Sequence, residues 1–84
     1  MFEVFEKTVK WKALLHIPTG RWVKLDYGDA VYGFLEDGIE RATLFAEDST
    51  FSKVTEGVDF QFHQIDPDDF EMRDVEVTYR LKES

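Results

Sequence analysis

The chain contains no cysteine among its 84 residues, and this absence excludes several chemistries at once. Disulfide staples, thiolate metal sites and cysteine nucleophiles all need a thiol. Small secreted domains are often stapled by disulfides, so a domain of this size without them favours a reducing compartment. We therefore expect a cytoplasmic protein.

Long apolar runs are also missing. The longest stretch without Asp, Glu, Lys or Arg spans residues 13–20, far short of the roughly 20 residues that a membrane helix needs. Residues 1–7 carry charge too early for a secretory signal. The sequence therefore predicts neither a membrane span nor a leader.

The motifs that mark common catalytic and cofactor sites are absent as well. The five glycines form no G-x-x-x-x-G-K or G-x-G-x-x-G phosphate loop, and no G-x-S-x-G elbow or H-E-x-x-H pair occurs. The acidic stretch 66–74 fails the EF-hand pattern, because Phe70 and Glu71 stand where a ligand and a glycine are required. We expect a protein that is not an enzyme and that holds no cofactor or metal.

Aromatic and acidic side chains are what the chain has in quantity. Eight Phe, three Tyr and two Trp can fill the core of one short domain, residues 1–84. The net charge is −8, and residues 26–84 hold sixteen acidic groups against five basic ones. Such a surface keeps a small protein soluble, repels nucleic-acid phosphates and attracts basic proteins. The charge therefore predicts a protein partner, such as a basic or nucleic-acid-binding protein, and no direct nucleic-acid partner.

A hairpin is predicted in the first third of the chain. Residues 11–17 and 21–25 alternate with the period of a strand, and Pro18-Thr19-Gly20 between them suits a short turn. Residues 2–9 either extend the first strand or form a separate one. We expect one face of the first strand to enter the core: Trp11, Ala13, Leu15 and Ile17.

The middle of the chain allows two interpretations. Residues 31–35 form a strand, or residues 30–35 form one helical turn capped by Asp29, since so short a segment satisfies both patterns. Asp37-Gly38 is a typical hairpin turn, and 39–46 then continues as a strand.

The last part of the chain predicts a helix and a long strand. The segment Asp48-Ser49-Thr50 supplies the side-chain oxygens of a helix cap, with Ser49 as the expected cap, and Gly57 lies where a helix ends, so a helix of about two turns is expected over 49–56. Residues 60–62 suit a short strand and 66–69 a turn. The segment 73–81 alternates most clearly, with one face packing: Arg73, Val75, Val77, Tyr79 and Leu81.

These elements predict an α+β fold. We expect a four- to five-stranded, mostly antiparallel sheet, with one short helix packed on one face.

One constellation resembles the small accessory proteins encoded by tailed bacteriophages. It comprises Leu14-Leu15-His16-Ile17-Pro18-Thr19-Gly20-Arg21-Trp22-Val23, then Ala42-Thr43-Leu44-Phe45, a short helix and Val75-Glu76-Val77-Thr78-Tyr79. The resemblance implies expression in the cytoplasm of an infected bacterium, and a role in host takeover, counter-defence or fine regulation. It brings no catalytic residues with it.

The leading hypothesis is an acidic binding module that modulates a host protein. Trp22 shares a strand face with Lys24 and is the better candidate for an exposed anchor. In a sharper version, carboxylates of 66–76 and 36–48 imitate the phosphates of DNA. The expected partner-binding residues are Trp22, Asp66, Asp68, Asp69, Glu71, Asp74 and Glu76.

Two alternatives remain open from the sequence. One is a small-ligand or metal-binding regulator that uses His16, His63 and nearby carboxylates. The other is a self-assembling subunit that pairs through an edge strand such as 73–81. Both a monomer and a small homo-oligomer fit the sequence.

Overall fold

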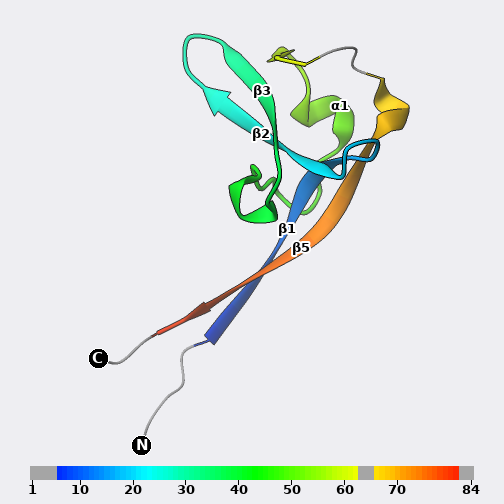
Figure 1. The fold of residues 1–84 in the computed structure, drawn as a ribbon. Coiled ribbons are helices and arrows are strands. Elements are labelled where there is room, and N and C mark those ends of the chain that lie inside the picture. Colours follow the sequence, from blue (N-terminus) through cyan, green and yellow to red (C-terminus); the bar gives the residue numbers. More distant parts are fainter. Residues whose placement is uncertain (1–5, 63–65, 82–84) are drawn as a thin grey trace, which may run out of the picture.

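The computed structural model describes residues 6–62 and 66–81 and contains a five-stranded sheet with one short helix (Figure 1). The order of strands across the sheet is β4-β3-β2-β1-β5. An α+β fold with five strands and one short helix is thus confirmed. The elements are β1 (Glu6–His16), β2 (Arg21–Tyr27), β3 (Val31–Glu36), η1 (Ile39–Arg41), α1 (Phe51–Val54), β4 (Val58–Phe60), η2 (Pro67–Asp69) and β5 (Phe70–Arg80).

The sheet is mixed rather than mostly antiparallel as predicted. β1 pairs antiparallel with both β2 and β5, and β2 pairs antiparallel with β3, but β4 runs parallel to β3. The chain leaves β3 and returns through η1 and α1, and such a crossover brings the next strand back in the same direction.

The predicted first hairpin is confirmed as β1 and β2. Gly20 has a φ of 66°, which glycine adopts without strain, and its N–H donates to the carbonyl of His16 at 2.9 Å. β1 begins at Glu6, so residues 6–9 extend the first strand. The rest of the segment 2–9 lies outside the described residues.

Residues 31–36 form a strand, β3, and not a helical turn. The strand predicted over 39–46 is wrong, because η1 replaces its first part and an extended segment follows. That segment enters the gap where β2 separates from β1. Thr43 donates its N–H to the carbonyl of Val23, and Phe45 exchanges two backbone hydrogen bonds of 2.8 Å with Lys12. Residues 42–46, which we call the wedge segment, thus join the two strands.

Helix α1 is shorter than the predicted 49–56. Its N-cap is Thr50 rather than Ser49, and no side chain caps it. Gly57 follows with a φ of 70°, as expected for a residue just past a helix end. The strand predicted over 60–62 is present as β4, displaced by two residues.

The core lies on one face of the sheet and is formed by Leu14, Val23, Leu25 and Phe70. Helix α1 packs against it, and further partly buried side chains complete it: Phe45, Phe51, Val54, Phe60, Phe62 and Met72. We call this side of the sheet the core face.

The prediction that Trp11, Ala13, Leu15 and Ile17 together face the core is wrong, although Ala13 is itself fully buried. Directly opposed residues of antiparallel strands share a face, and Leu14 and His16 of β1 lie opposite Met72 and Phe70 of β5. The residues from Trp11 to Ile17 that were expected in the core therefore lie on the opposite side of the sheet, which we call the outer face. Ile17 is 50 % exposed there. The core-face set of β1, Lys12, Leu14 and His16, has one aliphatic member, so the more apolar set of the strand lies away from the core and alternation favoured the wrong face.

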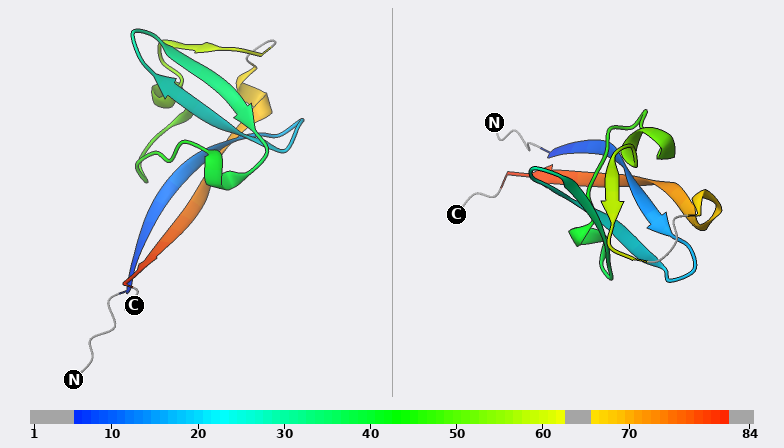
Figure 2. Two further views of the ribbon diagram at one scale, coloured as in Figure 1. Left: turned by 60° about the vertical axis from the view of Figure 1, so that its left-hand side comes forward. Right: turned by 90° about the horizontal axis from the view of Figure 1, so that it is seen from above.

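A long two-stranded ribbon extends from the body of the protein (Figure 1, Figure 2). β1 and β5 pair over eleven residues, and the molecule measures 56 × 27 × 23 Å. We call residues 6–11 and 75–80 the arm. The prediction that one face of 73–81 packs is wrong for this end, where Tyr79 is 54 % exposed.

The predicted turn at 66–69 is present as η2, in which the carboxylate of Asp66 accepts the N–H of Asp68 at 3.0 Å. Within residues 6–62 and 66–81, no helix has the length and apolar character that a membrane crossing requires.

Candidate protein-binding surface

The outer face of the β2–β3 hairpin carries three aromatic side chains in a row. The register of the two strands fixes which residues lie there, since directly opposed residues share a face. This placement agrees with the sequence prediction that Trp22 and Lys24 share a face. We call the following set the hairpin outer face: Trp22 opposite Glu36, Lys24 opposite Phe34, and Asp26 opposite Tyr32.

The aromatic rings of this surface reach solvent. Tyr32 is 41 % exposed and Phe34 is 39 % exposed, while Trp22 is half-buried. Tyr32 and Phe34 are two residues apart on β3, which separates their Cα atoms by about 7 Å. Trp22 lies diagonally across from Phe34, within reach of its ring. The three side chains form a strip of apolar surface in a region where a soluble strand usually presents polar groups.

Carboxylates flank this strip on both sides. Asp26 of β2 lies opposite Tyr32, and Asp59 of β4 is aligned with Tyr32 on the other side. Among the described residues, no cationic group lies within 4.0 Å of either carboxylate. At the other end of the strip, Glu36 lies 3.8 Å from Arg41. Tyr32 therefore has a free negative charge on either side.

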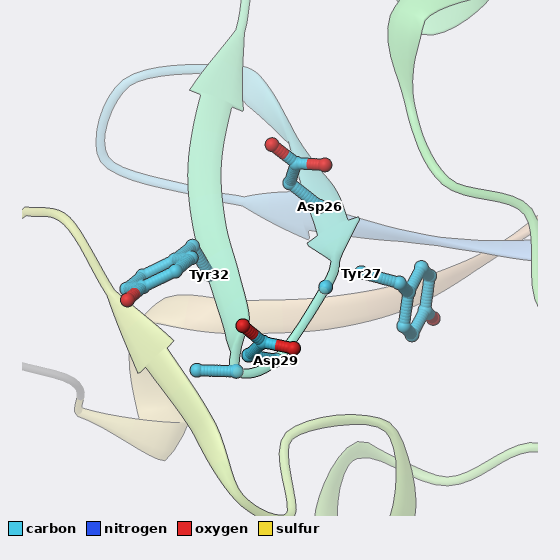
Figure 3. Close-up of a pocket in the computed structure, with 6 residues that line it drawn as sticks. Asp26, Tyr27, Asp29 and Tyr32 are labelled. Atoms are coloured by element: carbon cyan, nitrogen blue, oxygen red, sulfur yellow. The ribbon is translucent and has the colours of Figure 1, made fainter.

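The tip of the hairpin is hollowed, but its two tyrosines do not form a cage. The hollow, of about 480 Å³, is lined by Asp26, Tyr27, Gly28, Asp29, Ala30 and Tyr32. Figure 3 shows Tyr27 and Tyr32 pointing to opposite sides of the hairpin. Tyr27 lies opposite Val31, on the core-face side, and is 66 % exposed. Only Tyr32 belongs to the hairpin outer face.

The predicted acidic residues lie in three different places. Asp66, Asp68 and Asp69 belong to the η2 turn, where the carboxylate of Asp66 is used within the turn. Glu71 lies on the outer face, opposite Leu15, which in turn lies opposite Trp22. Its carboxylate is 3.5 Å from Arg73.

Asp74 and Glu76 lie on the other face, opposite lysines. Lys12 is paired with Asp74 and Lys10 with Glu76 across the ribbon. The Lys12 ammonium group, through its hydrogen bond first and its charge second, holds the pKa of Asp74 below its ordinary value. The stretch 66–76 is therefore divided between two faces, and two of its carboxylates have a cation opposite them.

His16 is a buried side chain with a local partner. It is 8 % exposed, its Nδ1 lies 2.8 Å from the hydroxyl of Thr19, and its ring packs 5.0 Å from that of Phe70. His63 lies outside the described residues. Within the part of the chain that the structure describes, no three His, Asp or Glu side chains are grouped so that they could hold a metal ion.

Four residues of this surface were missed from the sequence: Asp26, Tyr32, Phe34 and Asp59. The alternation of Tyr32, Gly33 and Phe34 was the available signal, and it became decisive only once 31–36 was known to be a strand. Asp59 could not be found, because its place beside Tyr32 depends on the parallel pairing of β4.

No protein-family model, curated protein or solved structure matches this chain. The assignment of a function therefore rests on the geometry of the surfaces described above.

Proposed function

We propose that this protein is a non-catalytic acidic binding module, and that its hairpin outer face binds an arginine-rich segment of another protein. One observation carries the proposal: the exposed rings of Tyr32 and Phe34 lie beside the half-buried Trp22, and the carboxylates on either side of Tyr32 have no cation within 4.0 Å in the described part of the chain. A guanidinium group stacks on aromatic rings and pairs with carboxylates, so this surface offers both of its preferred partners at once. Aromatic side chains are also the usual anchors of protein interfaces.

The negative charge of the body, by which we mean residues 12–74, favours a basic partner and acts over longer distances than direct contacts do. Residues 12–74 contain fourteen acidic and six basic side chains, a net charge of −8. Such a field attracts a basic protein and speeds its association, with an effect that falls as salt is added. The same field repels nucleic acid.

The resemblance to bacteriophage accessory proteins suggests where such a partner would be found. The proposal places the module in the cytoplasm of an infected bacterium, bound to a basic or nucleic-acid-binding host protein that it modulates. Imitation of DNA along 66–76 is the less favoured version. A DNA mimic needs carboxylates along one face, whereas Asp74 and Glu76 lie on the face opposite Glu71 and have lysines across from them.

Calorimetric titration with a twelve-residue peptide of alternating arginine and glycine tests the proposal. Tyr32→Ser removes an aromatic ring from the surface and should weaken binding about tenfold, the effect of losing roughly 1.4 kcal/mol at an interface. Tyr27→Ser is the matched control, because it removes the same ring from the other side of the same hairpin. It should leave the Kd unchanged.

The charges of the surface are tested in the same titration. Asp26→Asn and Asp59→Asn should each weaken binding, whereas Glu56→Gln, which removes a charge beside α1, should have a smaller effect. A lysine-glycine peptide should bind more weakly than the arginine peptide. Equal affinity for the two peptides, together with equal effects of the two tyrosine variants, would show general charge attraction and refute a site on the hairpin outer face.

A further inference from the structure

The outer edge of β5 is the longest unpaired strand edge in the described part of the molecule. β5 is the last strand of the sheet and pairs only with β1. In the arm, β1 and β5 form a two-stranded ribbon, and such ribbons are marginally stable in water by themselves. The outer face of this ribbon carries Val75, Val77 and the exposed Tyr79. An added strand would satisfy the free backbone groups and cover part of this apolar surface.

We propose that two copies of the chain pair through this edge, antiparallel and centred on Val77. In this register Val75 lies opposite Tyr79 of the second copy, and Val77 lies opposite Val77. On the other face Asp74 lies opposite Arg80 of the second copy. The two-fold axis repeats every contact between two different residues, so the pair of Asp74 with Arg80 forms twice, as in any isologous interface. Opposite charges are thus paired on one face and apolar side chains on the other, which is favourable across a strand pair, and Arg73 lies opposite Leu81 at each end.

Neighbouring registers are less favourable. Centring the pair on Glu76 places two like carboxylates directly opposite each other, which is destabilising. Centring it on Thr78 keeps opposite charges together, Glu76 with Arg80, but shortens the stretch of described residues that pair from 73–81 to 75–81. The charge pattern of the strand thus selects a register instead of blocking the edge.

The distribution of charge allows two acidic proteins to associate in this way. The arm contains two acidic and three basic side chains, whereas residues 12–74 hold a net charge of −8. Pairing centred on Val77 sets the two copies of Phe70 roughly 45 Å apart, and the body residues nearest the axis, the two copies of Asp74, roughly 20 Å apart. Both distances exceed the Debye length of about 8 Å at physiological salt, and the repulsion between the bodies is screened.

A second copy fits the arm better than the basic partner of the proposed function does. Lys7, Lys10 and Arg80 outnumber Glu6 and Glu76 in the arm, so a basic segment gains no attraction there. The dimer also uses a different part of the sheet from the hairpin outer face. Its test is therefore independent of the peptide titrations.

Sedimentation velocity between about 1 μM and about 1 mM tests the pairing. The molar mass should rise from 9.9 kDa toward twice that value as the concentration increases. Val77→Lys should abolish the rise, because it sets two ammonium groups beside each other at the axis. Val9→Lys is the matched control: Val9 lies directly opposite Val77 on the same face of the ribbon and is similarly exposed, but it is not on the pairing edge.

A charge exchange gives a second test that does not depend on how well Val77→Lys folds. Arg80→Glu and Asp74→Arg should each raise the Kd of the dimer on the order of tenfold. The double variant should recover most of that loss, because it restores the pairs between copies. It cannot restore the pairs that these residues make within one copy, Arg80 with Glu6 and Asp74 with Lys12. Recovery therefore reports on contacts between copies.

A mass of 9.9 kDa at every concentration would overturn the proposal. So would a dimer that survives Val77→Lys, or one that Val9→Lys removes, because the second result would assign the pairing to the edge of β1.

Discussion

At the scale of single residues, Gly33 allows the side chains of Val58 and Phe60 in β4 to pack closely against β3. It is buried in the middle of β3, and a Cβ atom there would be 2.5 Å from Cδ1 of Phe60 and 3.1 Å from Cγ1 of Val58. Gly33→Ala should therefore push these side chains aside and lower the free energy of unfolding by about 1–3 kcal/mol. Urea denaturation followed by tryptophan fluorescence measures the change.

Gly28→Ala serves as the control for this substitution. Its added methyl group would meet nothing closer than the carbonyl oxygen of Ala30 at 3.7 Å. We expect a change of less than about 0.5 kcal/mol. If both alanine variants lost the same stability, the close approach of Phe60 to Gly33 would not be the cause.

The ion pair between Lys12 and Asp74 should make stability depend on pH at the acidic end. The pKa of Asp74 is lowered by Lys12, so the stabilising contribution is complete above about pH 3.9, the usual aspartate value. It is lost as the pH falls from there through the lower pKa of the folded state. The difference in stability between the natural protein and Asp74→Asn should thus be present at pH 7 and absent at the acid end of that window. A difference that grows on acidification would contradict this pairing.

The sequence also shows how far single residues can be placed without a structure. It correctly grouped Trp22 with Lys24, because alternation depends only on strand geometry. It did not show which face of the sheet is buried. Trp11, Ala13 and Leu15 form an apolar set on one face of β1, but the core lies on the other face, with Leu14.

At the scale of elements, the wedge segment holds the sheet together where β1 and β2 separate. The hydroxyl of Thr43 accepts the backbone N–H of the buried Leu25 at 2.7 Å. Thr43→Val keeps the shape of the side chain and leaves this N–H without its acceptor. We expect a loss of about 1–3 kcal/mol in the free energy of unfolding, measured by urea denaturation.

Thr43→Ser retains the hydroxyl group and is the matched control. It should be clearly more stable than Thr43→Val. Equal losses for the two variants would mean that the methyl group of Thr43, and not its hydrogen bond, stabilises the segment.

Local patterns predicted the hairpin, the turn at 66–69 and the glycine conformation at Gly57 just after α1, all of which depend on residues close in the chain. The strand expected over 39–46 failed for the opposite reason. Residues 42–46 are extended, but their partners are Lys12 and Val23, which are distant in sequence. The parallel pairing of β4 is equally non-local, and it places Asp59 in the candidate site.

At the scale of the whole molecule, the excess of negative charge should oppose folding at low salt. All five ion pairs among the described residues include an exposed side chain, and such pairs contribute about 0–1 kcal/mol each. Because residues 12–74 carry a net charge of −8, we expect repulsion within the body to outweigh these pairs. Raising the NaCl concentration from about 10 to about 150 mM should raise the thermal unfolding midpoint. A midpoint that falls with salt would show that the ion pairs dominate.

The arm is a feature of the whole molecule that the sequence did not reveal. Glu6 pairs with Arg80, so the ribbon joins the two ends of the described chain. The alternation of 73–81 indicated a strand, and an edge strand was one hypothesis. Its partner, its register and its extension beyond the core could only be read from the folded chain, and so could the division of 66–76 between two faces.

The proposed binding of arginine-rich protein segments to the hairpin outer face can be followed residue by residue. Titration of the ¹⁵N-labelled protein with the arginine-glycine peptide, followed by two-dimensional NMR, tests it most directly. If the peptide binds there, the largest shifts occur at Lys24, Asp26, Tyr32, Phe34 and the indole N–H of Trp22. Shifts concentrated at 66–69, or no shifts at all, would contradict it.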